Sequence, residues 1–273
     1  VVSLTLLGLG TGGIFVHLFR PQIPRGDSRF DSLALFATLF ALSIPSSVII
    51  LTRIAFIESQ MVGILLYCLF LFIPFFFAGV LLAKIFRIFP DLSSKIYGAD
   101  LVGAAAGSLG VIFTLNTLGD INSSLLFAFL AALAALLIAT RVGQINIKGI
   151  ALPAISLIIM LILFGTNLIG SYLPNVPVGT NPIKEIYRSL EIYHGPYESA
   201  TRGEIVETRW SAFGRTDLVK VQDRPDSMIL YLDGVSGTPM YRFNGDFNNP
   251  DPGVLSLKTD FPGYLPFLHL PEE

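Results

Sequence analysis

The chain has 273 residues, of which 52% are hydrophobic and 14% charged, and its mean hydropathy is +0.67. Soluble globular proteins carry about 25% charged residues, so this composition excludes a disordered tail, a nucleic-acid binder and an ordinary cytosolic enzyme. A single cysteine, Cys68, excludes a disulfide framework and a cysteine-based zinc site. Residues 1–170 contain nine basic and six acidic residues, whereas residues 171–273 contain nine and fourteen. We therefore expect the two parts to lie in different solvents.

Six apolar stretches fill residues 1–170, and a helix of about 20 such residues crosses the hydrocarbon layer of a membrane. They are residues 2–19, 33–51, 61–83, 96–118, 125–140 and 150–169. The fifth is short, and tilting or the recruitment of residues 121–124 would lengthen it. We predict a transmembrane domain of about six helices in residues 1–170, with the lipid bilayer as partner and the cell membrane as location.

The basic residues between these stretches predict an orientation, because positive loops favour the cytoplasm. The loops after the first, third and fifth stretches carry three, three and two basic residues, respectively. The loop after the second stretch carries one basic residue, and the loop after the fourth carries none. The first set should face the cytoplasm, so six spans would put the C-terminal part outside. A marginal fifth span would reverse that result, and the sequence leaves the side of the tail open.

Residues 8–13, GLGTGG, satisfy the G-x-G-x-x-G pattern of a dinucleotide-binding turn, in which glycines let the backbone approach a pyrophosphate. A dinucleotide-binding turn joins a strand to a helix, whereas the GLGTGG motif lies among long apolar stretches that predict helices. Small residues on a membrane helix permit close helix contact, and we favour that interpretation.

Residues 97–110, YGADLVGAAAGSLG, contain a second run of small residues. Gly103 and Gly107 form a GxxxG pair, which predicts tight packing against another helix. Asp100 is the only carboxylate within a predicted span, and a carboxylate in lipid is by default a functional candidate. The alternative places Asp100 near the headgroups, at a helix N-terminus or paired with Lys95.

After a predicted linker at residues 171–189, residues 190–273 are expected to form a small antiparallel β domain. Its apolar and β-branched runs are residues 204–210, 216–222, 228–233 and 238–243. Asp233-Gly234 and Asp226-Ser227 supply turns. The three histidines, His17, His194 and His269, have no metal-binding spacing, and we predict neither a metal site nor a catalytic residue in this chain.

Four blocks resemble the membrane-attached spermidine synthases, which are aminopropyltransferases with an N-terminal multi-span domain. They are residues 97–110, WSAFGRTDLV at 210–219, LYLDGVSGTPM at 230–240 and GYLPFLHLPE at 263–272. Where soluble members of that family have glutamines, this chain has Gly214 and Gly237.

The resemblance implies a β-rich domain that closes over a polyamine such as putrescine. A following Rossmann-like domain would bind the co-substrate, decarboxylated S-adenosylmethionine, and supply the catalytic carboxylate. We expect the chain to be a fragment without that domain, binding no cofactor alone. The matching positions expected nearest the substrate are Tyr231, Asp233, Gly234 and Thr238, although Asp233 also fits a simple turn residue.

Two other classes of function remain open: a membrane transporter with the tail as a lid, and a non-catalytic membrane module whose β domain binds a partner. The transporter hypothesis draws on Asp100 and on prolines within the second and third stretches. It lacks a second intramembrane charge and the paired interrupted helices that many transporters use. The sequence also leaves open whether the chain forms a homo-oligomer.

Overall fold

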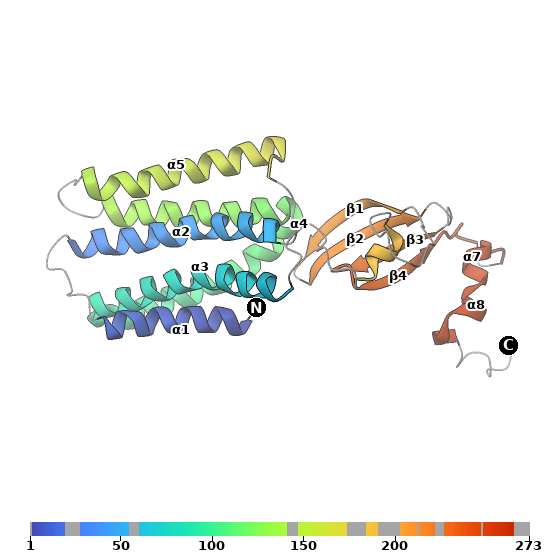
Figure 1. Ribbon diagram of the computed structural model, residues 1–273, viewed down its shortest axis with the longest axis horizontal. Helices are drawn as coiled ribbons and strands as arrows, with labels where there is room; N and C mark the ends of the chain where they lie inside the picture. The colour runs from blue at the N-terminus through green and yellow to red at the C-terminus, as the bar shows by residue number, and fades with distance from the viewer. Residues whose placement is uncertain are drawn as a thin grey trace. The chain divides into compact units, whose positions relative to one another are not determined.

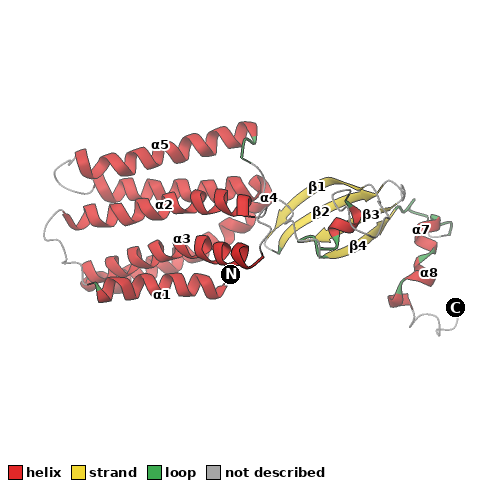
Figure 2. Ribbon diagram, viewed as in Figure 1, coloured by secondary structure: helices red, strands yellow, loops and turns green. Residues whose placement is uncertain are grey.

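The computed structural model describes residues 2–19, 28–54, 60–140, 147–173, 184–190, 203–211, 213–221, 227–246 and 248–264. The chain divides into two compact units, Val1–Thr180 and Asn181–Glu273. In the described residues the first unit is helical, whereas the second contains a β-sheet and short helices (Figures 1 and 2).

Five long helices build the first unit. They are α1 (Val2–Leu18), α2 (Ser28–Ile54), α3 (Gln60–Ile88), α4 (Ser93–Thr140) and α5 (Ile147–Gly170), with the 3-10 turn η1 (Pro90–Leu92) before α4. By length and composition, four helical stretches can cross a membrane: Arg29–Thr52, Met61–Ile88, Pro90–Thr140 and Gly149–Gly170. Helix α1 is apolar but shorter.

Helix α4 reverses direction at Gly119, whose φ of 77° and ψ of −173° are not helical. Ile96, near the start of α4, and Leu137, near its end, line the same cavity, so the two ends of α4 lie together. With α4 divided at Gly119, the bundle has six antiparallel segments that coincide with the six predicted apolar stretches (Figure 1). The prediction of about six helices is confirmed.

Glycines bring α1 and α3 into close contact. A Cβ added to Gly12 would lie 2.5 Å from the carbonyl oxygen of Phe76, and one added to Gly8 would lie 2.7 Å from Cβ of Phe75. Gly79 of α3 likewise meets the backbone of Leu9. Because the GLGTGG motif lies inside a helix, it lacks the strand-to-helix turn of a dinucleotide site, and its first and fifth residues serve helix packing instead.

Small residues also form the contact among α2, α4 and α5. Ala41, Ala128 and Ala132 are fully buried around Met160. One pair of polar side chains bonds between helices: the Asn167 amide donates to the Asn122 side-chain oxygen at 2.8 Å, which joins α5 to α4. Thr38 and Ser123 bond to carbonyls of their own helices. These bonds satisfy polar groups without water.

Arg29, Lys84, Arg87 and Lys95 lie at one end of the bundle, which we call the basic end, whereas Arg53 lies at the other end of α2. The Arg87 guanidinium of α3 donates to the Val16 carbonyl of α1 at 3.1 Å, and the Lys84 ammonium donates to Ser32 of α2 at 2.6 Å. Each joins the end of α3 to the terminus of a neighbouring helix, where backbone carbonyls or polar side chains are available. Because the segments alternate in direction, α5 ends at Gly170 on the opposite end of the bundle.

The second unit contains a four-stranded antiparallel sheet in the order β1-β2-β3-β4. The strands are β1 (Gly203–Ser211), β2 (Gly214–Val221), β3 (Ser227–Leu232) and β4 (Ser236–Tyr241). They match the four predicted runs within a few residues, and Asp233-Gly234 forms the β3–β4 turn as predicted. Helix α6 (Ile186–Ser189) lies within the range expected to be a linker, and the four-residue helices α7 (Pro252–Leu255) and α8 (Leu257–Asp260) follow the sheet.

We expect opposite signs for two alanine substitutions in α1. Gly12→Ala should lower the thermal unfolding midpoint of the detergent-purified protein, because its Cβ meets backbone atoms of α3 and overpacking costs about 1–3 kcal/mol. Gly10→Ala should leave the midpoint unchanged or raise it, since its Cβ meets nothing within 4 Å and alanine gains up to about 1 kcal/mol in a helix. Equal midpoints for the two variants would contradict the α1–α3 contact.

Candidate functional site

Two turns of the sheet lie side by side and bring together two of the three resembling blocks of the tail, residues 210–219 and 230–240. The β1–β2 connection precedes Gly214, and the β3–β4 turn contains Asp233 and Gly234. The Asp233 amide donates to the Arg215 carbonyl at 2.8 Å, and the Arg215 amide donates to the Asp233 carboxylate at 3.0 Å. We call this region, with Lys184 and Glu185, the turn end of the sheet.

Asp233 holds the turn end in place through an unusual backbone conformation. Its φ is 51°, in the left-handed region that aspartate tolerates better than most residues, and Gly234 follows with φ 72°. Gly214 has φ 135°, and a Cβ there would lie 2.8 Å from the Asp233 carboxylate oxygens. A glutamine, the family's residue at this position, would not fit this conformation.

Arg215 and Asp217 form a buried ion pair beside this turn. The Asp217 side chain is fully buried, the Arg215 side chain is 13% exposed, and the guanidinium Nε lies 2.9 Å from both carboxylate oxygens. The Thr208 hydroxyl of β1 donates to the same carboxylate at 2.7 Å. Because its oxygens are already occupied, Asp217 holds β1 and β2 in register and is not available to a ligand.

The segment before the sheet adds further charged groups to the turn end. The Lys184 ammonium donates to the Asp233 carbonyl at 3.0 Å, and the Gly237 amide donates to the Glu185 carboxylate at 3.3 Å. The Ile186 amide donates to the Gly234 carbonyl at 3.0 Å and docks α6 on the turn. The exposed carboxylates of Asp233 and Glu185 are therefore the acidic groups here that face water.

The four predicted substrate positions do not converge on one point. Tyr231 is buried, 3% exposed, and its hydroxyl is hydrogen-bonded to Ser189 at 2.6 Å. Tyr231 pairs with Gly237, whereas Thr238 pairs with Leu230 and therefore lies on the other face of the sheet. A Cβ on Gly237 would lie 2.7 Å from the Tyr231 ring, so the second family glutamine would not fit either. Asp233 and Gly234 remain together at the turn end.

The comparisons with known proteins give no family. No family model, no curated protein and no solved structure matches the chain. The resemblance to the membrane-attached spermidine synthases therefore remains a hypothesis.

The candidate residues of α4 lie on its surface: Asp100 and Gly103 are exposed and Gly107 is half-buried. Asp100 is exposed and forms no hydrogen bond or ion pair with a described residue, so the alternative pairing with Lys95 is absent in the described chain. A Cβ added to Gly103 or Gly107 meets nothing within 4 Å. Packing by these glycines stays a prediction and requires a neighbour other than the described helices.

Sequence analysis missed the pairing of Arg215 with Asp217 and the contribution of Glu185. The ion pair between Arg215 and Asp217 could have been predicted, because the two opposite charges lie two residues apart on one strand and such residues share a face of a sheet. Glu185 carried no such signal, since it lies in a segment expected to be a linker. In the residues that the structure describes, no three His, Cys, Asp or Glu side chains are placed to hold a metal ion.

We expect Arg215→Met to destabilise the sheet by about 3–5 kcal/mol, because it leaves the Asp217 carboxylate buried without its counter-ion. Trp210 is the only tryptophan and pairs with position 215, so its fluorescence during denaturation reports the sheet within the whole protein. Arg209→Met is the matched control, since its ion pair with Glu207 is exposed. Similar denaturation midpoints for both variants would contradict the structural role of the buried pair.

Tyr187 of α6 predicts a pH dependence. Burial raises its pKa above the ordinary value of 10.0, and the nearby Arg215 partly opposes the rise. Above pH 10 the unfolded chain loses this proton while the folded chain keeps it, so stability is complete below pH 10 and falls as pH rises. Tyr187→Phe should weaken this alkaline loss in Trp210-detected denaturation at pH 9 and 11. An unchanged pH dependence would refute the assignment.

Proposed function

We propose that the chain is the membrane-embedded and β-rich part of a spermidine-synthase-like aminopropyltransferase. The helical unit spans the membrane, and the β unit contributes to holding a polyamine such as putrescine. Decarboxylated S-adenosylmethionine is the co-substrate, bound by a part of the protein outside this chain. The membrane placement is supported by the four long apolar helical stretches, because only helices and closed barrels satisfy their backbone in lipid.

The turn end of the sheet is the observation that carries the proposal for the β unit. Two separate blocks that resemble the family contribute to it, and it presents the exposed carboxylates of Asp233 and Glu185. Carboxylates are the groups that hold a cationic amine, and charge-assisted hydrogen bonds are the strong ones. The hydroxyl of Tyr231 on β3 is hydrogen-bonded to Ser189 of α6 and so links this helix to the sheet.

In this account the chain's own residues bind and orient the amine. Asp233 and Glu185 hold one protonated nitrogen, while Arg215 is kept away from it by the ion pair with Asp217. The transfer itself, in which an unprotonated amine attacks the carbon beside a sulfonium, requires a base from the remaining part of the protein. No residue of this chain is assigned that role.

An activity assay on the protein encoded by the whole parent gene tests the proposal. Membranes containing it should release methylthioadenosine from decarboxylated S-adenosylmethionine in the presence of putrescine. Asp233→Asn should lower kcat/KM for putrescine by about tenfold or more, the loss expected for one charge-assisted hydrogen bond. Glu207→Gln, in the exposed pair with Arg209, is the control. No release above that of membranes without the protein would refute the proposal.

A non-catalytic membrane module is favoured by one observation, the position of the end of α5. Basic side chains gather at the opposite end of the bundle, and positive ends favour the cytoplasm. The chain would then leave the membrane on the outer side, away from a cytoplasmic co-substrate. The turn residue Phe213 is 89% exposed and Cys68 is the only cysteine.

A Phe213→Cys variant in a Cys68→Ala background decides between the two functions. Labelling in intact cells by a membrane-impermeant maleimide would favour the binding module and contradict the aminopropyltransferase. Labelling only after the cells are opened is the result that the enzyme hypothesis predicts.

A further inference from the structure

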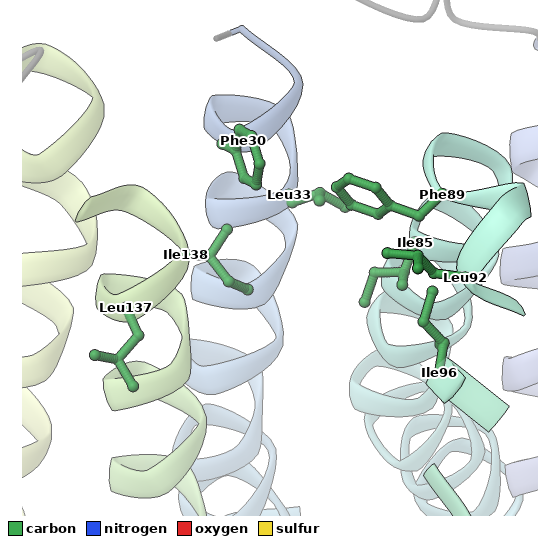
Figure 3. A pocket seen from close by; sticks show the side chains of 8 residues that line it. All are labelled: Phe30, Leu33, Ile85, Phe89, Leu92, Ile96, Leu137 and Ile138. Atoms are coloured by element: carbon green, nitrogen blue, oxygen red, sulfur yellow. The ribbon is translucent and has the colours of Figure 1, made fainter. Parts of the chain in front are cut away.

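A cavity of about 370 Å³ opens at the basic end of the helical bundle. Its wall combines segments far apart in the sequence, and all eight lining side chains are apolar (Figure 3). Six of them come from α2, α3 and the two ends of α4: Phe30, Leu33, Ile85, Ile96, Leu137 and Ile138. The volume is that of a ligand pocket.

The chemistry of the wall restricts the occupant to an apolar group. A water molecule needs polar partners, and the wall supplies none from its side chains. An empty cavity would deprive Leu33 and Ile138 of dispersion contacts. In a bilayer, a flexible acyl chain has the shape and polarity to fill such a space.

A buried basic side chain, that of Lys84, lies one residue along the chain from the cavity wall. Lys84 is 7% exposed and precedes the lining residue Ile85, and its ammonium is bonded to Ser32, which precedes the lining residue Leu33. The ammonium also lies 4.7 Å from the centre of the Phe36 ring. Lys84 has no ion pair with any carboxylate of the described residues. Within the described residues no carboxylate neutralises its positive charge, and an anionic ligand would complement it.

The surrounding charge has the same sign. Residues 28–36 and 84–96, which provide most of the cavity wall, contain four basic and two acidic residues. Arg29 and Lys95 each precede a lining residue, Phe30 and Ile96. A negatively charged group at the opening would complement this excess.

We propose that the cavity is a binding site for an anionic phospholipid, with one acyl chain in the apolar pocket and the phosphate beside Lys84. The inference rests on the membrane placement in the proposed function and is independent of aminopropyl transfer. The negative phosphate would complement the excess of basic residues at this end of the bundle, whichever leaflet that end lies in.

Native mass spectrometry of the full chain tests the site after reconstitution with equal amounts of phosphatidylglycerol and phosphatidylcholine in detergent. The wild type should retain phosphatidylglycerol in preference to phosphatidylcholine. Lys84→Met should reduce that preference about tenfold, the change expected when a charge-assisted bond to a phosphate is lost. Ile138→Trp should abolish retention by filling the pocket, whereas Leu130→Trp, an exposed position on the same helix, should not.

The result that overturns the site is equal retention of the two lipids by the wild type, or a preference that Lys84→Met leaves unchanged. The Lys84→Met comparison decides the matter even if Ile138→Trp does not fold. Extraction of the chain from membranes by alkaline carbonate would instead overturn the membrane placement itself. A chain that stays in the membrane without selecting phosphatidylglycerol contradicts this inference alone.

Discussion

The exposure of large apolar side chains along the helices is the constraint from which the rest of the account follows. Leu65, Leu109 and Phe113 are each more than 60% exposed on helices with almost no charge. In water each would cost about 1.5–3 kcal/mol relative to burial, whereas in lipid there is no such cost. The proposed bilayer would remove this cost from the bundle.

In the proposed bilayer, burial of apolar surface would not drive the helices together, so their packing would come from close approach and from internal hydrogen bonds. The bundle uses both. Gly12 and Gly79 let the backbones of α1 and α3 touch, and the Asn122–Asn167 bond links α4 to α5. The small-residue face at Gly103 and Gly107 has the same composition, and a Cβ added to either glycine meets nothing within 4 Å in the described residues. A second copy of the chain as its neighbour stays a hypothesis.

The main elements could be predicted because each depends on a local pattern. The lengths of the apolar stretches predict the helical segments. The segment between the fourth and fifth stretches contains Gly119, at which α4 turns. The alternation of apolar and polar residues predicts the strands, and the Asp233-Gly234 pair predicts one hairpin turn. Contacts between elements could not be predicted in this way: the pairing of Arg215 with Asp217 and the docking of Glu185 on Gly237 depend on three-dimensional proximity. Thr238 was grouped with Tyr231 from a sequence block, although the two lie on opposite faces.

Membrane extraction combined with proteolysis tests the central claim most directly. Membranes from cells that express the chain are washed with alkaline carbonate, opened and treated with protease. The account predicts that the chain stays in the pellet and that the β unit is digested, while a helical fragment ending near residue 173 remains in the membrane. Recovery of the chain as a compact monomer in solution without detergent would contradict it.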